Sequence, residues 1–337
     1  MRPWLPVLLL ILSTGCATRI GARSLPAVRA DYNQAVARSS SEQMLLNLVR
    51  LRYGHAIQFL EPVSVVTTYS FNRNASISGN TNLNGENSFA SIAGGVVGAG
   101  ISATETPTIT YTPLSGEDFV RQLAAPLPRD LLMLLVQGGW PAERLLPFAV
   151  SRIGSAAAPI IAAADDTSRF ARIVDGLTTL QASGDLVIEL AGPEPLIGLG
   201  ETPVARTLLA NLGLPEDTRS FTLSSQVVDP GDDEVPVRTR SMMDVLYYLS
   251  HGVEVSATDP AARDLGVPLP ISEPLLHIQS GKTVPSTAYV AIPYQDRWFW
   301  IDDTDRSSKS VFGTLTILFN LMGAPQEART PVLTLPR

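Results

Sequence analysis

The clearest pattern of hydrophobic and polar positions runs from residue 63 to residue 112. Odd positions between Val63 and Phe71 are mostly apolar or aromatic, whereas even positions are mostly serine or threonine. A period of two places alternate side chains on opposite faces of a strand. Residues 80–87 are polar and contain an Asn-Gly pair suited to a tight turn. The even positions from 102 to 112 are again all serine or threonine, so the pattern predicts a long antiparallel hairpin over residues 63–112.

The apolar row of this hairpin is a candidate surface for contact with a membrane or a partner. Its members are Tyr69, Phe71, Phe89, Val97, Ile101, Ile109 and Tyr111. A membrane-spanning strand needs about 9–11 residues, and both arms are longer. However, Arg73 and Glu105 interrupt the apolar rows, and the aromatic girdles typical of lipid-facing strands are sparse. We expect the hairpin to pack on a globular domain or on a neighbouring subunit, with insertion into a bilayer as the alternative.

A helical period precedes the hairpin, over residues 30–53. Ser40-Ser41-Glu42-Gln43 has the form of a capping box, which predicts a helix start there, and Gly54 predicts the helix end. Asn47 and Arg50 lie on the same helix as a broad apolar face. Either these polar residues are solvated, or Asn47 or Arg50 points inward and organises a neighbouring loop.

The remainder predicts short helices followed by a mixture of helices and strands. Glycine and proline breaks divide residues 116–153 into three helices, and Asp165-Asp166 begins a fourth that runs through Gln181. The later strand candidates are 186–190, 220–228, 275–279, 288–292, 298–302 and 332–335, and the helices are 239–251 and 307–322. The expected fold class is α+β: a helical N-terminal region with a long antiparallel β-hairpin, then a smaller mixed antiparallel sheet with packed helices.

The N-terminus has the organisation of a secretory signal. Arg2 supplies a basic start, and an apolar run from Val7 to Leu12 follows. This run is too short for a membrane-spanning helix, which needs about 20 apolar residues. Small residues then lead to Cys16, the sole cysteine of the chain. A plain signal segment with a chance cysteine is the alternative to one that directs lipid attachment.

The segment Leu12-Ser13-Thr14-Gly15-Cys16 resembles the lipobox of bacterial lipoproteins. It matches that family at Thr14, Gly15 and Cys16 and departs from it at Ser13, where the family usually has leucine. The resemblance implies that Cys16 becomes the new N-terminus and carries acyl chains such as palmitate. Ala17 follows, with no aspartate after the cysteine, which in this family implies the outer membrane.

The stretch 42–53 also resembles uncharacterised proteobacterial lipoproteins with an E-Q-x-L-L-N-x-V-R-L-R-Y segment. That resemblance implies no activity. We expect a signal peptide at 1–15, a lipid-proximal tether at 16–29, a helical region with the hairpin at 30–164, and an α+β domain at 165–337.

Charge and cysteine content narrow the function classes. The formal net charge of −7 becomes −8 when Arg2 leaves with the signal peptide. Lys282 and Lys309 are the only lysines, and the arginines are spread along the chain. A nucleic-acid-binding face needs concentrated basic residues, so we expect no nucleic-acid partner. A single cysteine cannot form an intramolecular disulfide, so the fold depends on a buried core.

Candidate catalytic or metal chemistry is sparse. His55, His251 and His277 have no metal-ligand spacing, and there is no G-x-S-x-G motif. The acidic segment 302–308 imitates the start of a calcium loop but lacks its glycine and closing glutamate, so we expect Asp305 or Ser307 to cap a helix instead. We expect no catalytic residue, no metal and no cofactor.

Trp298 and Trp300 share one face of a predicted hairpin whose turn lies at 295–297. They form either a binding platform or cross-strand core packing.

These observations predict a lipid-anchored envelope protein that faces the periplasm from the outer membrane. Its expected role is non-enzymatic binding or assembly with envelope proteins or with further copies of itself. The alternative is a subunit of an oligomeric outer-membrane export channel formed by the 63–112 hairpins. An envelope hydrolase is a weaker alternative.

Overall fold

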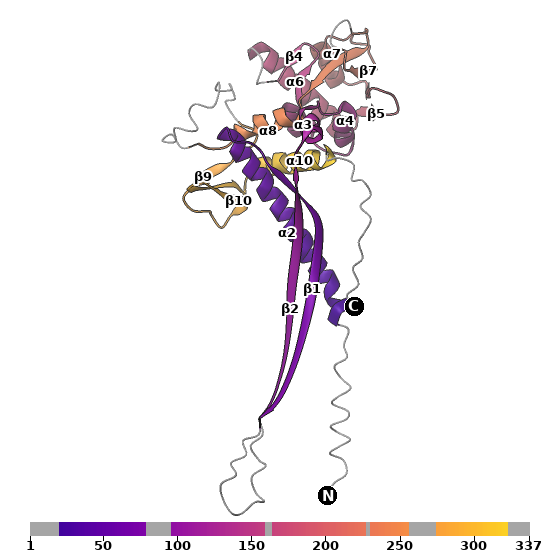
Figure 1. Cartoon of the computed structure of the whole chain (residues 1–337). Helices are drawn as coiled ribbons and strands as arrows, with labels where there is room; N and C mark the ends of the chain where they lie inside the picture. The colour runs from indigo at the N-terminus through magenta and orange to yellow at the C-terminus, as the bar shows by residue number, and fades with distance from the viewer. Residues whose placement is uncertain (1–19, 79–95, 159–163, 227–229, 256–273, 323–337) are drawn as a thin grey trace, which may run out of the picture. The chain divides into compact units, whose positions relative to one another are not determined.

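The computed structural model describes residues 20–78, 96–158, 164–226, 230–255 and 274–322. The chain is an α+β protein, and its described part contains eight helices and eleven strands in three sheets (Figure 1). Contacts within the chain divide it into two compact units. We call Met1–Phe59 with Ser115–Arg337 the body, and Leu60–Leu114 the hairpin unit. Among the described helices, none combines the length and the apolar character needed to cross a bilayer.

The long hairpin predicted from the alternating pattern is confirmed. Strand β1 (Phe59–Ser78) and strand β2 (Val96–Leu114) form an antiparallel sheet of their own, and both run as long neighbouring ribbons in Figure 1. The predicted contact residues fall on both strands: Tyr69 and Phe71 on β1, and Val97, Ile101, Ile109 and Tyr111 on β2. Of these side chains, the structure describes a half-buried Ile109 and an exposed Tyr111. Phe89 lies outside the described residues.

Helix α2 (Ile20–Arg52) is longer than the helix that the sequence predicts. It already begins at Ile20, so most of the expected tether at 16–29 is helical. It also continues through the predicted helix start, where the Ser41 hydroxyl donates to the carbonyl of Ala37 at 3.0 Å. A serine can satisfy its hydroxyl one turn back inside a helix, so the sequence that looks like a capping box interrupts nothing.

A six-stranded sheet forms one half of the body. Its strand order is β4 (Ala156–Ala157), β3 (Val150–Ile153), β8 (Glu234–Thr239), β7 (Ser220–Ser224), β6 (Leu196–Leu199) and β5 (Leu186–Glu189). All neighbours are antiparallel except β7 and β8, which are parallel. Because β3 pairs with β8, the sheet contains residues from both sides of the expected domain boundary at 164/165.

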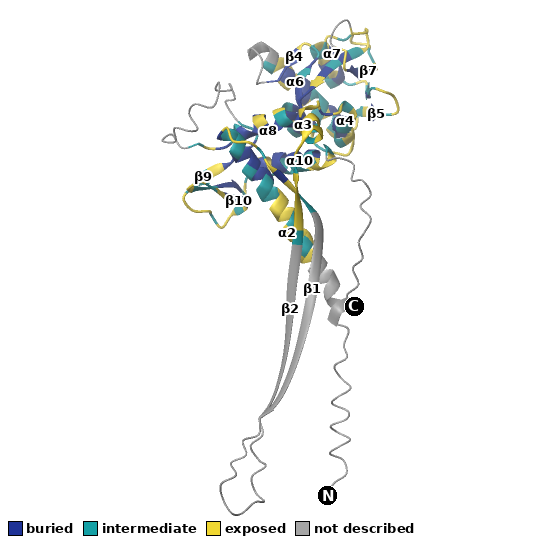
Figure 2. Ribbon diagram, in the orientation of Figure 1, coloured by how far each residue is buried: buried dark blue, intermediate teal, exposed yellow. Residues whose placement is uncertain are grey.

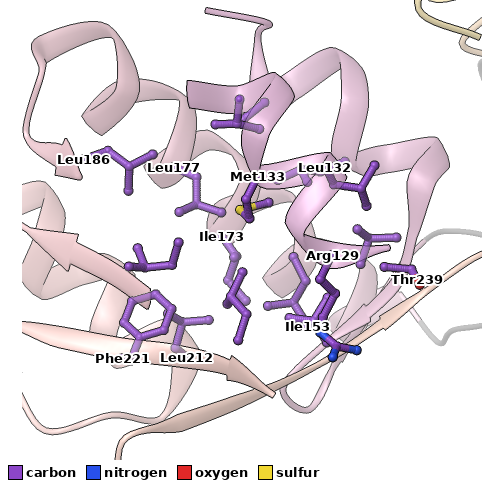
Figure 3. Close-up of a pocket in the computed structure, with 17 residues that line it drawn as sticks. Arg129, Leu132, Met133, Ile153, Ile173, Leu177, Leu186, Leu212, Phe221 and Thr239 are labelled. Carbon is purple, nitrogen blue, oxygen red and sulfur yellow. The ribbon is translucent and has the colours of Figure 1, made fainter. Parts of the chain in front are cut away.

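Four helices contribute apolar side chains to the core against this sheet. They are α4 (Arg129–Gln137), α5 (Ala142–Ala149), α6 (Ala164–Ser183) and α7 (Pro203–Leu212). Leu132, Ile173 and other apolar helix residues face Phe221 and its neighbours on the strands (Figure 3). The third of the predicted helices ends at Ala149 rather than at 153, because the chain continues there as strand β3.

A three-stranded sheet and the remaining helices form the other half of the body. The strand order is β10 (Ala288–Tyr294), β11 (Arg297–Asp302) and β9 (Gln279–Gly281). The helices are α3 (Glu117–Ala124), α8 (Met242–Ser250) and α10 (Arg306–Met322). Helix α2 packs against both β10 and α8, and buried residues gather along its C-terminal part (Figure 2).

Candidate functional site: the root of the long hairpin

The polar centre of the site is Asn47, which is completely buried on α2. Its Nδ2 donates to the Gln58 carbonyl at 2.8 Å, and its Oδ1 accepts from the Gln58 amide at 2.9 Å. One side-chain amide therefore satisfies both backbone groups of a single residue, as a strand partner would. Because Gln58 immediately precedes β1, Asn47 fixes the place where the chain leaves α2 for the hairpin. Of the two interpretations of this helix, the structure therefore supports the one in which Asn47 points inward and organises a neighbouring loop.

An aromatic stack holds the next residue. Phe59, the first residue of β1, is only 3% exposed. Its ring stacks on Phe319 of α10 with centroids 4.3 Å apart, and it meets Phe119 of α3 edge to face at 6.2 Å. Aromatic pairs of this kind contribute about 0.5–1.5 kcal/mol each beyond the burial of their area. We call Asn47, Gln58, Phe59, Phe119 and Phe319 the hairpin root.

The root receives the chain at both ends of the hairpin. Strand β1 starts at Phe59, and α3, which carries Phe119, begins shortly after β2 ends at Leu114. Phe319 lies near the C-terminal end of α10. Three segments that are distant in sequence therefore close on one residue, which makes the root a fixed base for the chain on either side of the hairpin.

A second aromatic cluster secures the end of α2 beside the root. The ring of Tyr53 lies 5.6 Å from that of Tyr294 and 6.0 Å from that of Phe299. The Tyr294 hydroxyl also hydrogen-bonds His55 Nδ1. Burial raises the pKa of Tyr294, and the nearby positive charge of Arg50 opposes this. These contacts tie the last turn of α2 to the three-stranded sheet, so Asn47 is presented from a braced helix.

The most deeply buried cation of the described chain is structural. Arg240 is 5% exposed, and its Nη1 donates to three carbonyls at the end of α5, those of Pro147, Phe148 and Val150, at 3.0–3.2 Å. Its guanidinium lies 5.0 Å from the centre of the Tyr248 ring. Burial lowers the pKa of Arg240 and raises the pKa of Tyr248. A cation at a helix C-terminus satisfies free carbonyls and opposes the helix dipole, so Arg240 joins α5 to α8.

An apolar cavity lies within the core. It has a volume of about 40 Å³ and lies between the helices and the six-stranded sheet (Figure 3). Its lining is apolar apart from Arg129 and Thr239. Pockets for small molecules typically measure about 300–1,000 Å³, and small apolar voids stay dry. The cavity is therefore a packing void and offers no ligand site.

The predicted tryptophan platform is not open to a ligand. Trp298 is half-buried and pairs with Pro293 across the strands, while Trp300 is 9% exposed and pairs with Ala291. The Trp300 ring also lies against Gly281, where an added Cβ would stand 3.0 Å from the ring. Cross-strand packing, the other interpretation of these residues, fits the observed burial. The predicted turn of this hairpin is confirmed, with Gln295 at a φ of 51°.

The acidic segment caps a helix, as predicted. Asp305 precedes α10 and accepts hydrogen bonds from the Ser308 amide at 3.0 Å and the Ser308 hydroxyl at 2.7 Å. The same Ser308 oxygen accepts from the His277 amide at 2.8 Å, which links the start of α10 to the strand region. Within the described residues, no group of three or more histidine, cysteine, aspartate or glutamate side chains is placed to hold a metal.

His251 is the C-cap of α8, as its place before Gly252 predicts, and its Nδ1 lies 2.8 Å from the Tyr247 carbonyl. Burial lowers its pKa. The remaining predicted site residue, Cys16, lies outside the described residues.

Comparisons with family models, with curated proteins and with solved structures find no match to this chain.

Proposed function

We propose that this protein is a lipid-anchored envelope protein with a non-enzymatic assembly role, in which the hairpin unit makes the contact and the body holds it. The observation that carries the proposal is the hairpin itself. Strands of 20 and 19 residues form a sheet of their own. A two-stranded hairpin is marginally stable by itself in water, so a ribbon of this length gains most when something pairs with it or packs on it.

The hairpin root supports an assembly role over a catalytic one. Its polar groups are used to hold backbone, as Asn47 holds Gln58. Its remaining members are phenylalanine rings in contact with one another. Such a base resists displacement of the strand that leaves it, which suits an element that transmits binding to a fixed body. An envelope hydrolase would need a reactive group at a concave site, and the groups described here fulfil structural roles.

The proposed localisation of the protein is based on its N-terminal sequence. The lipobox-like segment ending at Cys16 supports export, acylation and retention at the outer membrane facing the periplasm. Two or more acyl chains give stable anchoring, whereas one gives marginal affinity. The membrane is therefore the first partner in this proposal, and envelope proteins or further copies of the chain are the second.

A subunit of an oligomeric outer-membrane export channel is the second candidate. Strand length favours it, because both β1 and β2 exceed the roughly 9–11 residues that a spanning strand needs. Bilayer insertion would require every backbone group of the hairpins to be paired. An export channel would therefore require several copies of the chain. As in the first candidate function, the hairpin unit would make the contacts.

A shortened hairpin tests the proposal. We would replace residues 64–110 with Asn-Gly, which keeps the root and the strand ends next to the body, and compare this chain with the wild type and with Cys16→Ser in envelope fractions. The shortened chain should remain membrane-bound but lose its high-mass complex, whereas Cys16→Ser should leave the membrane fraction. Retention of the full complex by the shortened chain would refute the assembly role of the hairpin. Thermal unfolding of the shortened Cys16→Ser chain controls for an intact body.

A further inference from the structure

We infer that the partner of the hairpin is a second copy of this chain, with the open edge of β2 in one copy paired antiparallel to the open edge of β1 in the next. This inference rests on the proposed assembly function and names the partner of that same site. It follows from the edges of the hairpin sheet, from the direction of its strands and from their charges.

Both outer edges of the hairpin sheet are open in the described part of the chain, where β1 and β2 pair only with each other. In an antiparallel pair, alternate residues direct their backbone groups away from the partner strand. Natural sheets protect such edges with short strands, lysines, prolines or charges. β1 has Pro62 near its start and, beyond it, one charged residue, Arg73. β2 has Pro107 and Pro113 in its last eight residues and one charged residue, Glu105, so its first nine residues contain neither a proline nor a charge. Neither strand contains a lysine.

The direction of the strands makes the two edges complementary. β1 and β2 are antiparallel within one chain. When two copies lie side by side and point the same way, β2 of the first is therefore also antiparallel to β1 of the second. The same contact can be repeated from copy to copy, and such a heterologous contact forms a ring when its rotation closes. Lipid anchors at the same end of each copy would favour this common orientation.

The charges favour this pairing over a two-fold one. The distal charge of β1 is positive and that of β2 is negative. Opposite charges on facing strands stabilise a sheet, and like charges destabilise it. A β1–β2 contact brings unlike strands together, whereas a two-fold β1–β1 or β2–β2 contact brings like ones together.

The number of hydrogen bonds is sufficient for a stable interface. Pairing along a strand of this length forms on the order of 20 backbone hydrogen bonds. A typical protein–protein interface has about 10 direct hydrogen bonds. The contact also protects the long edge of each strand, and ring closure would leave neither edge open.

Cross-linking between single-cysteine chains tests the inference. Leu60 on β1 and Tyr111 on β2 are 44% and 40% exposed and both lie near the strand ends at the body. The full-length, lipid-bearing chain would be made as Leu60→Cys and as Tyr111→Cys, separately and together in one cell, and treated with a short bis-maleimide in intact envelopes. Thr110→Cys and Thr112→Cys, at two further exposed positions, allow for a shift in register. Separate chains exclude cross-links within one hairpin.

The inference predicts a dimer from the mixed chains at least about tenfold stronger than from either variant alone. Val187→Cys, at an exposed position on β5 of the body, gives the background. Dimers from one variant alone would overturn the inference in favour of a two-fold contact. Cross-links only to a protein of different mass would overturn it while the proposed assembly function stands. Absence of a dimer at all three β2 positions would overturn it as well. The shortened hairpin separately decides the assembly function.

Discussion

The six-stranded sheet of the body and the two-stranded sheet of the hairpin differ in how their edges are protected. The six-stranded sheet of the body ends in β4, with two residues, and in β5, with four. The β5 edge is also shielded, because Gln137 Nε2 donates to the Ile188 carbonyl at 3.1 Å. The hairpin sheet has strands of 20 and 19 residues, and no third strand covers either of them in the described part of the chain.

The two parts of the chain are therefore stabilised by different interactions. The body is held by packed side chains, such as the stacked Phe59 and Phe319, which act whether or not another molecule is present. The hairpin depends on backbone hydrogen bonds, and within one chain the described outer edges of β1 and β2 have no strand partner. Changes in the body should therefore lower the free energy of unfolding, whereas changes in the hairpin should alter assembly and leave that free energy nearly unchanged.

The largest expected effect is at Gly252. A Cβ added there would stand 1.6 Å from the Leu276 carbonyl oxygen, where the Gly252 carbonyl accepts from the Ile278 amide at 2.9 Å. Gly252→Ala must push these two segments apart, so we expect a loss of about 4 kcal/mol or more in the free energy of unfolding. Denaturant unfolding of the Cys16→Ser chain measures it.

Gly313→Ala is the matched control, because a Cβ there meets nothing within 4 Å. Inside α10, alanine should stabilise the protein by up to about 1 kcal/mol. Equal unfolding curves for the two alanine variants would show that the body lacks the tight approach at Gly252.

The next largest effect is at Asn47. Asn47→Leu removes the two part-buried hydrogen bonds between the Asn47 side chain and the backbone of Gln58, and each such bond contributes about 0.5–1.5 kcal/mol. We expect a loss of about 2 kcal/mol in the free energy of unfolding, together with faster proteolysis near Gln58. Asn33→Ala, at an exposed position of the same helix, should change stability by less than about 0.5 kcal/mol. If Asn47→Leu unfolded at the same temperature as the wild type, the proposed role of Asn47 in the hairpin root would be contradicted.

A smaller effect is expected from charge reversal on the hairpin. Arg73→Glu gives both strands negative distal charges, and a cross-strand charge pair contributes about 0.2–1 kcal/mol. Assembly on dilution in mild detergent should weaken by up to about fivefold per contact, with the unfolding of the body unchanged. Arg73→Glu combined with Glu105→Arg should restore it. Failure of the double variant to recover would argue against pairing between β1 and β2 of different copies.

The smallest effect is expected at the shielded edge of the body. Gln137→Ala removes one hydrogen bond to Ile188 from an exposed side chain, so stability should fall by about 0.5 kcal/mol. Because β5 stays short, the mass of the assembly should not change. Glu189→Ala, on the same strand, is the control. If Gln137→Ala produced larger assemblies, shielding rather than strand length would be what separates the two sheets.

Local patterns predicted the hairpin and most helices, because alternation, caps and glycine breaks act over a few residues. Strands β3 and β6 escaped prediction because each has only four residues and little alternation to mark it. Strand β8 does alternate, but Pro236 in its middle argues against a strand. The 150–153 segment extends the apolar run of α5 and could not be distinguished from a helix end before its pairing with β8 was known.

The hairpin root was predictable only in part. Asn47 was noticeable as a polar residue within an apolar helix face, which is a local signal. Phe59, Phe119 and Phe319 meet only through the tertiary fold, and each by itself looks like an ordinary core phenylalanine. The sequence could not show whether the tryptophans are exposed as a binding platform, because the burial of Trp300 depends on how β9 and β10 flank β11 in the tertiary fold.

The mass of the full-length, lipid-bearing protein in mild detergent tests the central claim most directly. Light scattering or analytical ultracentrifugation would compare it with the chain in which Asn-Gly replaces residues 64–110. We predict a protein mass of several copies for the wild type and of one copy for the shortened chain. A wild-type protein that has the mass of a single copy and no bound partner would contradict the account.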